Sequence, residues 1–222
     1  MSPLAPPPTL EQINLMVENS RAVRHPLIKL LSHNPNNRHA WQVFAAHHHP
    51  IVREFPYHIQ ALFRRLDADT AQRLHPVLAD EFDPGEMASA NDAAPDFSAH
   101  ARLQVALCHS LGTEPTVTSL PAVQTFIDEH RRISREAEVA FALGVFGPGH
   151  EAAVPMMFRQ LVSGAPPYAN PSYLFEHLTI DVIHAQCFAD VLKDFDLFKV
   201  EAGAAWSLDL RARAWDAILE AI

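Results

Sequence analysis

The chain of 222 residues has little cysteine, little glycine and almost no strand-like alternation of apolar and polar residues. Its two cysteines, Cys108 and Cys187, lie in apolar stretches of helical character, so we interpret them as small core residues and exclude a disulfide framework. With only 7 glycines and no alternating strands, the sequence argues against an all-β fold. These deficits favour an all-α protein.

Basic charge and long apolar runs are scarce as well. The 17 Lys and Arg are outnumbered by 26 Asp and Glu, and the formal net charge of −9 argues against general nucleic-acid binding and adhesion to anionic membranes. No apolar run is long enough to span a bilayer. The first eight residues lack the basic and apolar regions of a signal peptide. We therefore expect a cytoplasmic protein.

Helical periodicity accounts for most of the chain. Residues 1–8 are expected to form a flexible Pro-rich arm and residues 86–96 a surface loop. Helices are expected over about residues 9–20, 23–31, 38–66, 67–82, 97–111, 119–132, 134–163, 170–198 and 207–222. This length supports one sizeable core. Residues 9–222 are therefore expected to form a single-domain helical bundle.

Cap and breaker residues define where these helices should begin, bend or end. Thr9 and Gln12 form a capping box, Asn170 is expected to be an N-cap before Pro171, and Ser134 and Ser207 are expected to cap later helices. Prolines and glycines should interrupt two long helices, at Pro50 and Pro56 and at Gly144, 147–149 and Pro155. His47-His48-His49, before Pro50, is interpreted as a helix-end cluster.

The stretch 177–184 carries the strongest chemical signal. At about 100° per residue, His177, Asp181 and His184 fall within roughly 60° of one another on one helix face. The helix is apolar nearly all round, so we expect it to be buried. Burying these groups without partners would cost several kcal/mol. One metal ion, such as iron, manganese or zinc, would serve as the partner of all three side chains at once. The alternative is a polar network without metal, for example His–Asp pairs bridged by water.

A metal site in a bundle needs further ligands from facing helices. Glu81, His100 and Glu151 are candidates. Each also fits an ordinary role, Glu81 as an exposed acid at a helix end and His100 as a surface residue in a first turn. Glu151 also fits an acid at the N-terminus of a restarted helix, where its negative charge would interact favourably with the helix macrodipole.

Together these residues resemble the haem-oxygenase-like diiron oxidases and oxygenases, over about residues 20–200. The family pattern is a Glu late in one helix, a His at the start of the next, a Glu four residues before a Pro in a stretch beginning Ala-Leu-Gly, and His-x3-Asp-x2-His. The matching residues are Glu81, His100, Ala142-Leu143-Gly144 with Glu151 and Pro155, and His177, Asp181 and His184. Two departures are a longer gap between Glu81 and His100, which implies an insertion, and the break at 147–149.

The resemblance implies a haem-oxygenase-like fold (shared with TenA and PqqC) in which these six residues bind two Fe(II) per chain. It implies that O2 oxidises a small amine, amino-acid or carboxylate substrate, by N-oxygenation, desaturation or C–C fragmentation, in specialised metabolism. His150 stands where the p-aminobenzoate synthases that consume their own tyrosine place that tyrosine, so an external substrate is expected. Candidate pocket residues are Phe146, His150, Phe158, Arg159 and Tyr173.

Two other functions stay open. A metal-free enzyme of the same fold would use a carboxylate or cysteine nucleophile, and Cys187, one turn past His184 and in apolar company, is a poor candidate for one. A non-catalytic helical interaction protein would tolerate apolar replacement of His177, Asp181 and His184. The expected partners are a small-molecule substrate and O2, with no nucleic acid and no membrane, and a homodimer is an allowed assembly.

Overall fold

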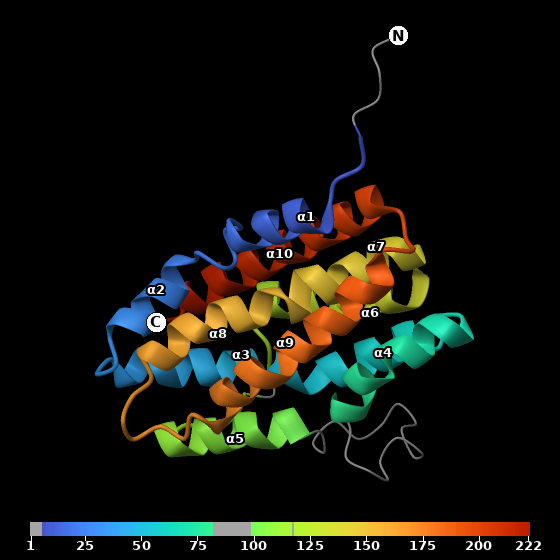
Figure 1. Cartoon of the computed structure of the whole chain (residues 1–222). Helices are drawn as coiled ribbons and strands as arrows, with labels where there is room; N and C mark the ends of the chain where they lie inside the picture. Colours follow the sequence, from blue (N-terminus) through green and yellow to red (C-terminus); the bar gives the residue numbers. More distant parts are fainter. Residues whose placement is uncertain (1–5, 82–98, 117) are drawn as a thin grey trace.

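The computed structural model describes residues 6–81, 99–116 and 118–222, which form an all-α bundle without a strand (Figure 1). Residues 1–5 of the predicted arm and the predicted loop 86–96 lie outside the described residues. The helices are α1 (Leu10–Glu18), α2 (Pro26–His33), α3 (Arg38–Phe63), α4 (Ala68–Glu81), α5 (Ala99–Leu111), α6 (Pro121–Glu136), α7 (Val139–Phe146), α8 (Ala153–Ser163), α9 (Ser172–Leu192) and α10 (Leu197–Glu220), with a π-helical turn η1 (Gly147–Glu151).

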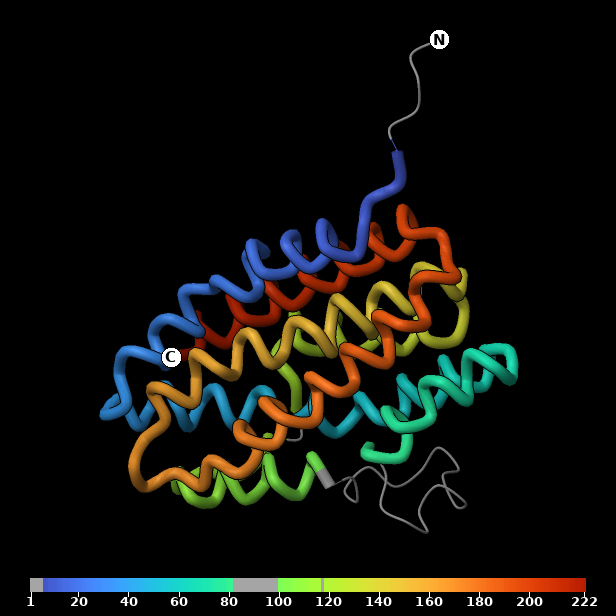
Figure 2. The backbone as a smooth tube through the Cα atoms, viewed as in Figure 1, coloured from blue at the N-terminus to red at the C-terminus, as the bar shows by residue number. Residues whose placement is uncertain are grey.

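The helices pack so that segments distant in sequence become neighbours. The C-terminal α10 packs against α7 and α6 and lies beneath α1 and α2, and the end of α10 lies beside α2 (Figure 2). On the other side, α9 packs against α8 and α4, while α3 contacts α5 and α6. Two clusters of buried apolar side chains fill the space between these helices. The cavity described below lies among α3, α4, α5, η1, α8, α9 and α10.

Local sequence signals explain several helix ends. The capping box of α1 is confirmed, because Gln12 N donates to Thr9 Oγ1 at 3.2 Å and Thr9 N donates to Gln12 Oε1 at 2.8 Å. Gly112, after α5, has a φ of +76°, which favours glycine. At the start of α9 the prediction is wrong by one residue. Pro171 takes the N-cap position, and Asn170 Oδ1 accepts from Ser172 N at 3.1 Å.

Two predicted serine caps are wrong. The hydroxyl of Ser134 donates to Arg131 O within α6, and Ser207 is buried in the middle of α10, where its Oγ lies 3.1 Å from His130 Nε2. The cap of α10 is Asp196, whose carboxylate accepts from Phe198 N at 3.0 Å. A serine hydroxyl can bond within a helix or to a neighbouring helix, so a serine before an apolar run is a weak start signal.

The predicted interruptions have different outcomes. Pro50 and Pro56 lie inside α3, which continues from Arg38 to Phe63 without a break. The interruption at 147–149 is confirmed as the π-helical turn η1, in which Ala152 N donates to Gly147 O at 3.1 Å. A Cβ added at Gly147 would lie 2.7 Å from Phe188 Cδ1, so this turn fits closely against α9.

The backbones of α7 and α10 touch. A Cβ added at Gly144 would lie 2.1 Å from Val200 O, and one added at Gly203 would lie 2.1 Å from Phe141 O. These approaches require the absence of a side chain at both glycines. The two helices can therefore pack at this distance only with glycine at these positions.

The expectation that α9 is buried nearly all round is wrong. Phe175, Val182 and Ile183 are 51%, 49% and 58% exposed, so the helix presents an apolar outer face. Its inner face is buried, as expected from the position of its polar residues.

Other expectations concern cysteine chemistry and membrane spans. Cys108 is buried, which confirms it as a core residue, whereas Cys187 is only partly buried at the edge of the core. The two cysteines are free thiols, as expected. None of the helices within the described ranges has the length and apolarity needed to cross a membrane.

Candidate metal centre

One face of α9 points three polar side chains into the bundle. His177, Asp181 and His184 are 7%, 3% and 0% exposed, and they follow the spacing of a single helix face. The outer face of the same helix is exposed, so these residues are the ones that α9 turns toward α4, α5 and η1.

Three further polar side chains meet them from other elements. Glu81 is the last residue of α4, His100 lies in the first turn of α5 and Glu151 is the last residue of η1. All three are at most 4% exposed. The alternative roles of Glu81 as an exposed helix-end acid and of His100 as a surface residue are therefore wrong, whereas Glu151 does lie just before the start of α8.

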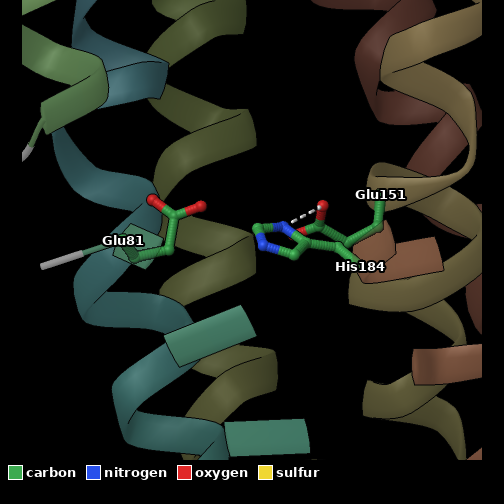
Figure 3. A group of neighbouring side chains, drawn as sticks. All are labelled: Glu81, Glu151 and His184. Carbon is green, nitrogen blue, oxygen red and sulfur yellow. Dashed lines mark hydrogen bonds and ion pairs between the residues drawn. The ribbon is translucent and has the colours of Figure 1, made fainter. Parts of the chain in front are cut away.

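Glu81, Glu151 and His184 form the tightest group. Each offers one ligand atom, and these atoms lie within 4.8 Å of one another. Figure 3 shows Glu81 reaching in from one side while Glu151 and His184 come from the opposite side. His184 Nδ1 lies 3.2 Å from Glu151 Oε2. Two carboxylates and an imidazole at this separation suit a divalent iron, manganese or zinc ion.

His100, His177 and Asp181 line the same cavity as the two glutamates. His100 Nδ1 lies 3.3 Å from Glu81 Oε2, and the ring centroids of His100 and His177 are 4.7 Å apart. The cavity has a volume of about 20 Å³, enough for a small ion or a water molecule. The structure thus brings all six predicted ligands into one buried region.

Hydrogen bonds outside this region orient two of the imidazoles. His177 Nδ1 donates to the backbone carbonyl of Tyr173 at 2.7 Å, which leaves its Nε2 as the nitrogen with a free lone pair. His184 Nε2 donates to Asp80 Oδ2 at 3.1 Å, which leaves Nδ1 facing Glu151. Metal-binding histidines in proteins are commonly held by a carbonyl or carboxylate in this way. Asp80 was not identified from the sequence.

Two buried atoms in this region, His100 Nε2 and Glu151 Oε1, make no hydrogen bond or ion pair among the described residues. Glu81 Oε2 makes no hydrogen bond either, but it lies within ion-pair distance of His100 Nδ1. A buried polar atom without a partner costs roughly 1–3 kcal/mol. Carboxylate oxygen and imidazole nitrogen are both metal donors, so a metal ion fits these residues and would satisfy atoms that the protein leaves unpaired.

The charges of the group favour a cation. Burial raises the pKa of Asp181 well above its usual value, and the neighbouring carboxylates Glu151 and Glu81 raise it further. Burial likewise raises the pKa of Glu151. For His184, burial opposes protonation, but the hydrogen bond and charge of Glu151 outweigh it and raise its pKa to about 9. A divalent cation would supply the positive charge that lets these acids ionise.

Two further residues of the cavity wall were not identified from the sequence. His48 was interpreted as part of a helix-end cluster, which is wrong, because it lies inside α3 at 3% exposure and lines the cavity. Arg211 in α10 is fully buried, lines the cavity and donates from Nη2 to His150 Nδ1 at 2.6 Å. Leu208, Arg211 and Trp215 follow one another at helical spacing, so Arg211 lies on the same helix face as two apolar residues. This spacing could have indicated from the sequence that Arg211 is buried.

The five candidate pocket residues divide into three groups. His150 and Tyr173 line the cavity. Phe146 and Phe158 are buried behind it, with the Phe158 ring 5.0 Å from that of His177 and the Phe146 ring 6.1 Å from that of Phe55.

Arg159 requires a correction. Its side chain is exposed and borders a surface hollow together with Glu18 and Arg24, away from the cavity. It follows buried Phe158 in α8 and is therefore turned by about 100° toward the outside.

Buried histidines near the cavity should make the protein sensitive to acid. Burial, and next the charge of Arg211, lowers the pKa of His130 from 6.5 to about 3. Between these values the unfolded chain binds a proton that the folded chain does not, so stability falls as pH falls below 6.5. We expect His130→Asn to reduce the slope of unfolding free energy against pH by about 1.4 kcal/mol per pH unit between pH 6 and 4, measured by urea denaturation. His75→Asn, at an exposed position, is the control, and an unaltered slope in the His130 variant would contradict the prediction.

Comparisons with known proteins identify the fold. No family model matches the sequence, and no curated protein matches it. Among solved structures, a TenA homologue from Pseudomonas syringae superposes with a TM-score of 0.73 at 13% identity, covering 99% of each chain. A domain with a haem-oxygenase-like fold from Shewanella denitrificans gives 0.66 at 18% identity, covering 96% of this chain and 91% of that one. A CADD-like protein of unknown function from Nostoc punctiforme gives 0.70 at 17% identity, covering 96% of each chain.

These likenesses extend over nearly the whole chain and at such low identity concern the fold alone. They agree with the all-α architecture and with the fold expected from the six-residue pattern. The chain has the haem-oxygenase-like, all-α fold that TenA homologues share.

Proposed function

We propose that this protein is a non-haem diiron oxygenase or oxidase that uses O2 to oxidise a small amine, amino-acid or carboxylate substrate. The observation that carries the proposal is the meeting of three carboxylates and three imidazoles in one buried region, with two of their atoms, His100 Nε2 and Glu151 Oε1, unpaired. Such a set is costly to bury for structural reasons alone. Carboxylates and histidines that project inward from facing helices are also what hold the metal ions in diiron carboxylate bundles.

In this proposal the six residues hold two Fe(II), which when bound supply electrons for the reduction of O2. Glu81, Glu151 and His184 would hold metal in the group with the closest donor atoms, and His100, His177 and Asp181 would complete the set. Asp80 and the carbonyl of Tyr173 keep two of the imidazoles in the tautomer that can bind metal. The apolar part of the wall limits the access of water to the reacting groups; it consists of Ile51, Val52, Phe55 and Val154.

Anaerobic titration with Fe(II) tests this proposal. The full chain should take up about two Fe(II), and addition of O2 should then produce a transient visible absorption band. The binding of iron is measured by equilibrium dialysis and elemental analysis. A folded chain that binds no iron under these conditions would refute the proposal.

A second candidate is a metal-free enzyme of the same fold, and one observation favours it. Both ring nitrogens of His184 already have carboxylate partners, Glu151 and Asp80, so this histidine is satisfied without a metal. Such an enzyme would use Glu151 and not a thiol, because burial raises the pKa of Cys187 and raises that of Cys108 to about 12. Undiminished turnover in the presence of a metal chelator would support this candidate.

A further inference from the structure

Three arginines gather at one surface hollow of a chain whose formal net charge is −9. The hollow has a volume of about 300 Å³, and its wall consists of Tyr57, Gln60, Ala61, Arg64, Arg65 and Arg135. No carboxylate belongs to this wall among the residues that the structure describes. The hollow therefore concentrates positive charge on an otherwise acidic protein.

The hollow lies on the side of α3 that faces away from the metal centre. Phe55 lines the cavity of the metal centre and Tyr57 lines the hollow, and two residues turn an α-helix by about 200°. Arg64 and Arg65 directly follow α3, and Arg135 lies in the last turn of α6. Because α3 separates the two places, a molecule bound in the hollow does not touch the six polar residues of the metal centre.

The ends of two helices explain why the fold tolerates these charges. Arg65 donates to three backbone carbonyls at the C-terminal end of α6, two of them at 3.2 and 2.9 Å. Arg64 is the C-cap of α3, and its Nη2 donates to Gln60 Oε1 at 3.1 Å. These acceptors carry no net charge. A helix C-terminus carries a partial charge of about −0.5, so two helix ends reduce the three positive charges to about +2.

The remaining charge of the hollow belongs to the wall as a whole. None of the three guanidinium groups is without a partner, because Arg64 and Arg135 make contacts besides those named above. The summed charge of the wall, and not an unpaired donor, should therefore attract an anion. Acids on either side of Arg135 in the sequence pair with other cations, Glu129 with Arg132 at 2.8 Å and Glu138 with a lysine of α10.

We propose that this hollow binds the phosphate group of a small molecule. A phosphate monoester carries a charge of about −1.5 to −2 at pH 7, which matches the charge of the hollow better than a monoanion does. Guanidinium groups bind two phosphate oxygens at once through parallel hydrogen bonds. Tyr57 and Ala61 provide an uncharged part of the wall for the rest of the molecule, and about 300 Å³ lies within the range of ligand pockets.

Binding of inorganic phosphate to the full-length, metal-free chain tests this inference. At about pH 8 and constant ionic strength set with sodium chloride, phosphate should raise the thermal midpoint and give a calorimetric binding isotherm. Acetate, a monoanion, should do neither. Phenyl phosphate should bind at least as tightly as inorganic phosphate, because the hollow has room for its ring.

Two variants and a matched control assign the binding to the hollow. Arg64→Gln and Arg135→Gln should each weaken phosphate binding roughly 10- to 100-fold, because each removes a charged hydrogen-bond donor. Both side chains are exposed, so both variants should fold. Arg132→Gln removes the same charge from α6 outside the hollow, where Arg132 pairs with Glu129, and should bind phosphate as the unaltered chain does.

The inference is overturned if phosphate and acetate bind equally, if neither binds, or if the Arg64 and Arg135 variants bind phosphate as tightly as Arg132→Gln does. Binding of inorganic phosphate without binding of phenyl phosphate would overturn the assignment to a small organic molecule. Iron takes no part in these measurements, so their outcome is independent of the proposed oxidation.

Discussion

His184→Ala should abolish iron binding by the protein. The imidazole lies between Glu151 and Asp80, and it belongs to the group whose ligand atoms lie within 4.8 Å of one another. Loss of an outer partner of a metal ligand weakens metal binding roughly 10- to 100-fold, and loss of the ligand itself should weaken it more. Equilibrium dialysis with Fe(II) under anaerobic conditions measures the change, and O2 consumption should fall with the iron content.

A graded pair of variants keeps this prediction testable. His184→Ala leaves Glu151 buried without its partner, which could cost about 3–5 kcal/mol and unfold the metal-free chain. Asp80→Asn removes only the half-exposed carboxylate that orients His184, so it should fold normally and lower iron affinity by roughly 10- to 100-fold. His109→Ala, at an exposed histidine, is the control. Full iron uptake by both the His184 and the Asp80 variants would contradict the metal assignment.

Gly144→Ala should destabilise the fold strongly without touching the metal centre. The new Cβ would lie 2.1 Å from Val200 O, a backbone atom that cannot move aside without shifting α10. Helix propensity alone would favour alanine by about 1 kcal/mol, so any loss reports on this contact. We expect a net loss of roughly 3 kcal/mol, which lowers the thermal midpoint by about 6–12 °C.

Gly203→Ala tests the same interface from α10, since its Cβ would lie 2.1 Å from Phe141 O. It should produce a loss of similar size. Ala205→Gly is the control, because Ala205 is exposed on the same helix and should lose only about 1 kcal/mol of propensity. If both glycine variants melt at or above the midpoint of the unaltered chain, the close approach of α7 and α10 is wrong.

The fold and the six polar residues were accessible from the sequence for different reasons. Helical periodicity alone places His177, Asp181 and His184 on one face, because their spacing is local. Glu81, His100 and Glu151 come from separate elements, so local periodicity cannot relate them, and only their resemblance to a family pattern placed them together. The structure brings these residues together, and their role as metal ligands stays a prediction.

The basic side of the cavity could not be predicted from local patterns. His48 belongs to a run of three histidines, and nothing in that run says which ring points inward until α3 packs against α5 and α6. Arg159 and Arg211 look alike as single arginines, yet one is exposed and the other fully buried. The expectation that α9 is buried nearly all round was wrong for the same reason. An apolar helix sequence does not show which of the helix faces a neighbouring helix covers.

The π-helical turn makes this part of the chain intolerant of changes in length. A turn closed by the bond from Ala152 N to Gly147 O contains one residue more than an α-helical turn. Deleting a residue there would restore regular winding and rotate Glu151 by about 100° relative to α7. We therefore expect a deletion at this point to turn Glu151 away from the cavity, whereas exchange of a side chain in the turn leaves the winding of the helix unchanged.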